Sequence, residues 1–101
     1  MQSSGVGNCI NMIAVNVECR LPLLMLVTMR GDWGEFNPWQ VPMGHSTPAV
    51  LEASGVIVKH APDASEIAET VAAAAQLAFN SYRAVAVLIG QRASGAKNWN
   101  R

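Results

Sequence analysis

The first residues that could do chemistry form a short polar run with two glycines, Ser3 to Asn8, which reads SSGVGN. Glycine-rich runs cradle phosphate because main chain without a Cβ can approach a ligand closely. The phosphate loop of nucleotide-binding proteins ends in Gly-Lys-Ser or Gly-Lys-Thr, and the dinucleotide fingerprint carries a third glycine at a fixed spacing. Only a fragment of either pattern is present here. The spacing by itself is therefore weak evidence for a phosphate site.

A second group of polar residues lies in the stretch from 30 to 44, which is rich in glycine and proline and has little periodicity. Arg30 follows an apolar run, and a guanidinium at the carboxyl end of a strand can bind a carboxylate, sulfonate or phosphonate through two hydrogen bonds. The alternative for Arg30 is an ion pair with Asp32 or Glu35 that orders the loop. Gln40 can donate a hydrogen bond to the same anion.

Histidine and aromatic residues near this stretch each have two readings. His45 could bind the acidic group of a substrate, or it could be a surface or helix-capping residue. Trp33, Phe36 and Trp39 could wall a site, or they could pack across a subunit interface, where aromatic residues are enriched. His60 is read as structural. The histidines and cysteines lack the spacing of metal ligands, so we predict no metal site.

Composition limits the class of protein. The chain has 101 residues, enough for one small domain, and its formal net charge is zero. Half of the residues are apolar and 14% are charged, against about a quarter in a typical soluble domain, so we expect surface to be buried against a partner. No basic patch points to nucleic acid or a membrane surface. The run Leu21 to Met29 is too short to span a membrane and no signal-peptide pattern is present, so a cytoplasmic location is expected.

Apolar periodicity predicts alternating helices and strands. Helices are expected over about 7–20, 46–55 and 63–82, strands over 21–28, 56–60 and 84–90, and a long loop over 30–44. We interpret 21–28 as an interior strand and 1–3 as the end of an earlier strand. This order predicts an α/β fold with a parallel sheet and helices on both faces. The glycine run and the long loop then lie at the carboxyl edge of the sheet, where such folds bind ligands.

The first predicted helix is apolar on nearly all sides, which indicates burial on nearly all sides. It contains Cys9 and Cys19, ten residues apart and so about 15 Å apart along a helix axis, too far to form a disulfide. We expect both to be buried free thiols.

Four stretches together resemble the pyrimidine-binding (PYR) domain of thiamine diphosphate-dependent decarboxylases: MQSSGVGN, LPLLMLVTMRGDWGE, NPWQVPMGHSTPAVLEASG and AVAVLI. Within that superfamily they are most similar to the sulfopyruvate decarboxylase alpha subunits and the phosphonopyruvate decarboxylases. The resemblance covers about residues 1–90, followed by a polar tail at 91–101. It implies a partial PYR domain with the thiamine diphosphate-binding type of α/β fold.

The resemblance gives the glycine run a different role. In this superfamily a separate PP domain holds the diphosphate and its Mg²⁺, while the PYR glycine loop lies against the aminopyrimidine ring. The residues implied to contact thiamine diphosphate are Ser4, Gly5, Gly7 and Asn8. Asn8 has capping of the following helix as its alternative role. The residues implied to contact the acidic substrate are Arg30, Gln40 and His45.

One part of the family pattern has no counterpart. Thiamine chemistry needs a carboxylate beside N1′ of the aminopyrimidine, and the family places that glutamate upstream of the glycine run. No carboxylate of this sequence takes that place, so we expect no catalytic residue and no activity from this chain alone. The predicted function is part of a 2-oxo acid decarboxylase whose active site is completed by a PP-domain subunit or domain in a homo- or hetero-oligomer. The alternative is a non-catalytic assembly module.

Overall fold

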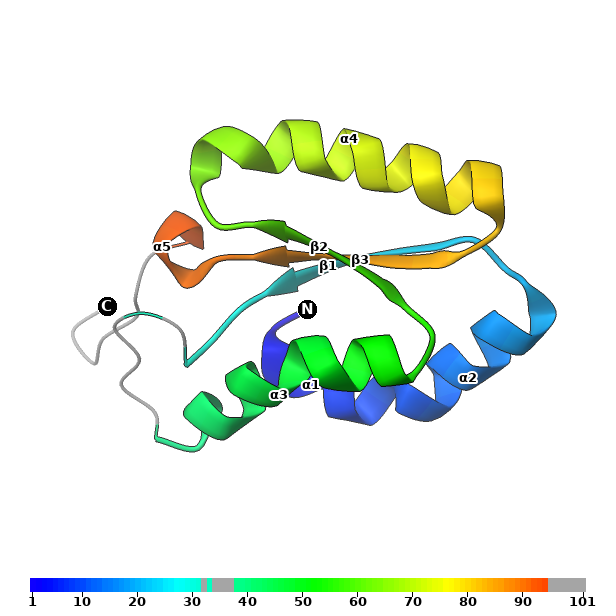
Figure 1. Cartoon of the computed structure of the whole chain (residues 1–101). Helices are drawn as coiled ribbons and strands as arrows, with labels where there is room; N and C mark the ends of the chain where they lie inside the picture. Colours follow the sequence, from blue (N-terminus) through cyan, green and yellow to red (C-terminus); the bar gives the residue numbers. More distant parts are fainter. Residues whose placement is uncertain (32, 34–37, 95–101) are drawn as a thin grey trace.

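The structure is a computed structural model that describes residues 1–31, 33 and 38–94. A three-stranded parallel sheet with helices on both faces confirms the predicted α/β class (Figure 1). The elements in chain order are α1 (Ser3–Val6), the 3₁₀ helix η1 (Gly7–Cys9), α2 (Ile10–Cys19), β1 (Leu23–Thr28), α3 (Gln40–Ala53), β2 (Ile57–Ala61), α4 (Ala64–Ser81), β3 (Ala84–Ile89) and α5 (Gln91–Ser94). Within these described ranges, no helix combines the length and apolar character that crossing a membrane requires.

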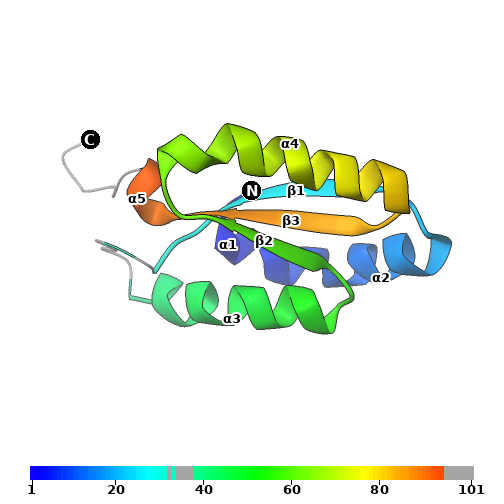
Figure 2. The ribbon, with the colours of Figure 1, turned by 45° about the horizontal axis from the view of Figure 1, so that its top comes forward.

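The last strand of the chain, β3, is the centre of the sheet. The strand order is β1-β3-β2, and the register sets Ala86 beside Met25 on one side and beside Val58 on the other. The sequence of β3, AVAVLI, is buried along almost its whole length because helices cover both of its faces (Figure 2). Its uninterrupted apolar run is the pattern expected of such a strand.

β1 is an edge strand of this sheet, so the prediction of an interior strand is wrong for the described sheet. Among the described residues, its outer side is paired at its carboxyl end: the amino group of Met1 donates to the Leu26 carbonyl at 2.7 Å, and the Thr28 N–H donates to the Met1 carbonyl at 2.7 Å. The strand end predicted over 1–3 is confirmed only at Gln2, which forms an isolated parallel bridge with Thr28, because Ser3 already begins α1. Because Leu26 is 42% exposed, one part of β1 lacks the cover that an interior strand has.

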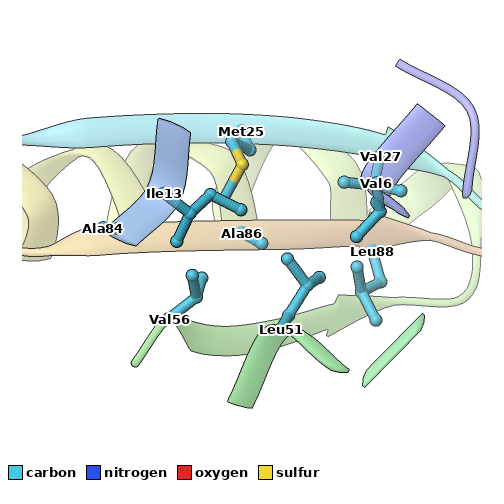
Figure 3. Packing of buried hydrophobic residues seen from close by; sticks show 9 residues of the cluster. All are labelled: Val6, Ile13, Met25, Val27, Leu51, Val56, Ala84, Ala86 and Leu88. Atoms are coloured by element: carbon cyan, nitrogen blue, oxygen red, sulfur yellow. The ribbon is translucent and has the colours of Figure 1, made fainter. Parts of the chain in front are cut away.

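Two apolar clusters hold the helical layers to the sheet. The first lies under α1, α2 and α3 and consists of Val6, Ile13, Met25, Val27, Leu51, Val56, Ala84, Ala86 and Leu88 (Figure 3). The second lies under α4, where Ala74 and Ala78 pack against Val85 and Val87. Each large side chain buried in this way contributes about 1.5–3 kcal/mol to stability, so both faces of β3 stabilise the fold.

The helix predicted over 63–82 is confirmed as α4. Asp63 is its N-cap residue and Tyr82 its C-cap residue. Ile67 and Val71 recur at helical spacing on the face that packs onto the sheet, as the periodicity predicted.

The helix α3 begins at Gln40, well before the predicted start near residue 46. As a result Pro48, near the start of the predicted helix, lies in the interior of α3. A proline there removes one backbone donor, and nearby hydroxyls bond back to the helix: Ser46 Oγ and Thr47 Oγ1 donate to the Met43 carbonyl at 3.1 and 2.7 Å. The predicted stop is confirmed, because Gly55 follows the helix with φ 91°.

The helix α2 is only partly buried within this chain. Ile13 is fully buried, whereas Met12 and Val15 are 48% and 55% exposed. The prediction of burial on nearly all sides is therefore wrong for the chain by itself. Cys9 and Cys19 are both free, as predicted, but Cys19 is exposed and Cys9 is half-buried.

Candidate functional site

The carboxyl ends of β1 and β3 lie at one end of the sheet (Figure 1), and buried polar residues gather there. Arg30 follows the end of β1, Gln91 follows β3, Ser3 starts α1 and Gln40 starts α3. With Thr47 of α3, these make up the buried polar residues of the described part of the chain. Polar groups are costly to bury, so their gathering at the carboxyl edge marks the candidate site.

A hydrogen bond ties the glycine run to the end of β1. The Arg30 N–H donates to Ser3 Oγ at 3.1 Å, and Ser3 is fully buried. Ser3 was not among the predicted site residues, while its neighbour Ser4 is half-buried. The bond brings the predicted cofactor segment and the predicted substrate residue Arg30 together. This agrees with the expectation that both segments lie at the carboxyl edge of the sheet.

Two glycines let the backbone after β1 lie directly on α3. A Cβ on Gly44 would come within 1.8 Å of the Arg30 carbonyl oxygen, and a Cβ on Gly31 within 2.4 Å of the Gln40 carbonyl oxygen. Gly31 also has a left-handed φ of 71°, which favours glycine. This packing sets Arg30 beside the first turns of α3 and so brings two predicted substrate residues, Arg30 and Gln40, into one place.

Gln40 carries a polar atom without a partner. The side chain is 7% exposed, and its Oε1 accepts no hydrogen bond from the residues that the structure describes. An unsatisfied buried acceptor costs about 1–3 kcal/mol, which singles out Gln40 as a place where a ligand donor would be favourable. The sequence predicted that Gln40 donates to an anion, whereas the structure leaves its acceptor oxygen as the unpartnered atom.

His45, also predicted to contact substrate, is exposed on α3 and lies outside the buried polar group. His60, the last but one residue of β2, is exposed as well. It lines a hollow of about 270 Å³ together with residues of three other segments: Met29, Pro48, Pro62, Leu88 and Gly90. The polarity of that hollow comes from one imidazole and backbone groups, so it offers little to recognise a charged ligand.

The glycine run is helical, and no described residue lies close enough to require glycine there. A Cβ on Gly5 would meet Met1 atoms at 3.7 Å or more, and one on Gly7 would meet Met43 Cε at 3.8 Å, both ordinary contacts. Gly7 is exposed, with φ −56°. An alanine would therefore fit at either position, and the exposed Gly7 is the one of the two that a group from outside the chain can approach.

The prediction that Asn8 caps the following helix is wrong. Asn8 is exposed inside η1, and the N-cap residue of α2 is Cys9, without a side-chain capping bond. The 3₁₀ turn continues the chain into α2, so Asn8 sits too early to cap it. Its amide is left available at the same edge as Gly7.

The structure adds a residue that sequence reasoning missed. Gln91 is 1% exposed, and its Oε1 accepts a hydrogen bond from the Trp33 N–H at 2.7 Å. The Arg92 guanidinium lies 5.5 Å from the centre of the Trp33 ring, within the range of a cation–π contact. The predicted polar tail thus begins with a short helix that holds Trp33. Gln91 comes directly after Gly90, at the start of a polar stretch that could equally be an exposed tail. The sequence therefore carried no sign of this role.

Other predicted loop residues lie partly outside the structural description. Trp39 is 70% exposed. Asp32, Glu35 and Phe36 lie outside the described residues, as do residues 95–101 of the predicted tail. The alternative ion pair of Arg30 with Asp32 or Glu35 therefore remains a prediction.

Comparison with known proteins relates the chain to one enzyme. The sulfopyruvate decarboxylase alpha subunits of Methanothermobacter thermautotrophicus and Methanococcus maripaludis are each 33% identical to it over 90 residues, which make up 88% of this chain and 54% of each relative. This chain is a relative of the sulfopyruvate decarboxylase alpha subunits. It spans about half of their length. No protein-family model matches the sequence.

A shorter match agrees with this relationship. A sulfopyruvate decarboxylase of Methanosarcina acetivorans is 42% identical over 57 residues, or 55% of this chain and 15% of that protein.

The described residues of this chain contain no group of three His, Cys, Asp or Glu side chains that could hold a metal ion. What the carboxyl edge offers is a guanidinium, amides, a hydroxyl and open glycine backbone, a set suited to binding rather than to proton transfer.

Proposed function

We propose that this chain supplies one wall of the active site of a decarboxylase that acts on a 2-oxo acid of the sulfopyruvate type. The observation that carries the proposal is the convergence of Ser3, Arg30 and Gln40 at the carboxyl edge of the sheet, next to the glycine run. Similarity to proteins named sulfopyruvate decarboxylase subunit alpha supports the substrate class. The sulfonate and carboxylate of such a substrate are the anions that an arginine binds well.

Thiamine diphosphate is the cofactor that we propose. The exposed Gly7 and Asn8 favour contact with a flat heterocycle, because main chain without a Cβ can approach a ring closely. Ser4, Gly5, Gly7 and Asn8 would contact its aminopyrimidine side. When bound, this cofactor supplies the electron sink that makes loss of carbon dioxide possible. This chain's part is to position the ring and exclude water from one side.

In this proposal, Arg30 binds the anionic group of the substrate. Its side chain is 8% exposed, and a guanidinium in a largely desolvated place binds an anion more strongly than one in water. Gln40, which is buried beside the same place, would donate a hydrogen bond from its side-chain amide to that anionic group, since a sulfonate and a carboxylate offer only acceptors. His45, exposed on α3, would contribute where a partner brings substrate to that helix.

The proposal requires a partner. The diphosphate, its Mg²⁺ and the carboxylate for N1′ would come from outside the described residues, with a PP-domain subunit or domain as the proposed partner. The relatives are named as alpha subunits, which supports an assembly of more than one chain.

Arg30→Met tests the proposal in the assembled enzyme. We expect kcat/KM for 3-sulfopyruvate to fall by about 100-fold or more while the affinity for thiamine diphosphate changes little, because Arg30 would contact substrate and not cofactor. Lys59→Gln, which removes an exposed charge on β2, is the matched control and should leave both constants unchanged. Equal loss in both variants, or tight Mg²⁺-dependent cofactor binding by this chain alone in calorimetry, would contradict the proposal.

A second candidate function is a non-catalytic assembly module. The exposed apolar side chains Met12, Val15 and Val17 of α2 favour it, since such residues on one helix indicate contact with another chain. The two functions separate in the assay above. An assembly module would need the α2 surface intact and would be indifferent to Arg30→Met.

A further inference from the structure

A hollow of about 330 Å³ lies at the amino ends of β1 and β3, at the opposite end of the sheet from the candidate site. It is lined by Val17, Arg20, Tyr82, Arg83 and Ala84. Leu23, the first residue of β1, pairs with Ala84, the first of β3, so the hollow sits where the chain leaves α2 and α4 to enter the sheet.

Two positive charges border this hollow without partners. Arg20 and Arg83 are exposed, and in the part of the chain that the structure describes neither guanidinium forms an ion pair or a hydrogen bond. Their backbones are fixed, however: the Arg20 N–H donates to the Val17 carbonyl at 3.2 Å and the Arg83 N–H to the Ala78 carbonyl at 3.1 Å. Glu18, the acidic residue nearest to Arg20 in sequence, is exposed and unpaired.

Two non-glycine residues at the hollow have a left-handed backbone conformation. Arg20 and Tyr82 both have φ 56°, and they are the two non-glycine residues with positive φ among those the structure describes. Each ends a helix, a position at which glycine is the usual residue. The chain does use glycine after α3, at Gly55. Both positions line the same hollow, so the side chains of Arg20 and Tyr82 border it where glycine would leave it bare.

Charge decides which ligand the hollow suits. The carboxyl ends of α2 and α4 each carry about half a negative charge, which the two guanidiniums outweigh. We propose that the hollow binds a small oxyanion, a carboxylate or a phosphate, between Arg20 and Arg83, with the Tyr82 hydroxyl as a further donor. Val17 and Ala84 give it an apolar side, and its volume is at the low end of small-molecule sites. This site is independent of the proposed decarboxylase function.

Titration of the ¹⁵N-labelled chain with inorganic phosphate, and separately with acetate, tests the proposal. We expect saturable NMR shifts at residues 20 and 82–84. Arg20→Gly, which suits the left-handed backbone, and Arg83→Gln should each weaken binding about tenfold, the factor for one charge-assisted hydrogen bond. Lys59→Gln is the control that removes an exposed charge elsewhere and should bind as the parent does.

The two anions distinguish the ligand's source. Saturation by phosphate alone assigns a phosphate compound, and saturation by acetate alone assigns a carboxylate; either supports the site. Saturation by neither anion overturns the proposal. So does an equal loss of affinity in Lys59→Gln and Arg83→Gln, because binding would then follow net charge and not the hollow.

Discussion

Glycine residues at the carboxyl edge separate into structural and functional kinds. We expect Gly44→Ala to lower the free energy of unfolding by about 3 kcal/mol or to displace the start of α3, because its Cβ would overlap the Arg30 carbonyl oxygen at 1.8 Å. Backbone atoms of two packed segments would have to separate. Urea denaturation followed by circular dichroism measures the change.

Gly7→Ala is the matched control. Gly7 has a helical φ of −56° and space for a Cβ, so we expect its replacement to change stability by less than about 1 kcal/mol, in the stabilising direction. The same variant should weaken thiamine diphosphate binding in the assembled enzyme. Similar losses of stability in Gly7→Ala and Gly44→Ala would refute this division of roles.

Gln40→Met removes the buried side-chain oxygen that lacks a hydrogen-bond partner among the described residues. Methionine has a similar volume and no polar atom to leave unsatisfied, so we expect the chain to become more stable by about 1 kcal/mol. In the assembled enzyme the same change should raise KM for the 2-oxo acid. Thermal unfolding and steady-state kinetics check the two effects, and a less stable variant would mean that Gln40 already has a partner inside the chain.

Residue types alone located part of this site. Arg30 and Gln40 were predicted because a guanidinium and an amide beside a strand end suit an anion, and both are buried there. Ser3, Gly31 and Gln91 were not predicted. Their roles depend on contacts between segments far apart in the chain, such as the bond from the Trp33 N–H to Gln91, and spacing along one segment carries no record of such contacts.

At the scale of elements, periodicity predicted what local sequence determines. The helix α4 and the strand β3 were placed correctly because an amphipathic repeat and a buried apolar run each fix their own type of structure. The start of α3 was placed too late. Gly44 and Pro48 are weak helix formers, and the close contact with Arg30 that stabilises a helix there is tertiary.

The left-handed backbone at the ends of α2 and α4 costs stability. Arg20→Gly and Tyr82→Gly should each raise the free energy of unfolding by about 0.5–1 kcal/mol, because glycine adopts φ 56° without the steric cost that a Cβ brings. Gly55→Ala is the reverse change and should destabilise, since φ is 91° and the new Cβ would lie 3.3 Å from Val17 Cγ2. Chemical denaturation of the three variants measures these effects, and a loss of stability in both helix-end variants would show that their side chains stabilise the fold.

At the scale of the whole molecule, the chain leaves apolar surface that it does not cover itself. Met12 and Val15 on α2 are about half exposed, and Leu26 on the edge strand β1 is 42% exposed. The low content of charged residues predicted such surface, but only the fold shows which residues form it. A small domain has few buried contacts to lose, so covering this face would stabilise it appreciably.

We therefore expect the chain to self-associate through α2. Sedimentation equilibrium should give a mass above that of one chain at micromolar concentration, and the double variant Met12→Glu/Val15→Glu should return it to a monomer, because charges are costly to bury in an apolar contact. Phe79→Glu is the control: Phe79 is 58% exposed on α4, on the other face of the sheet, and its replacement should leave association intact. A parent chain that is monomeric at every concentration, or equal disruption by Phe79→Glu, would exclude α2 as the contact surface.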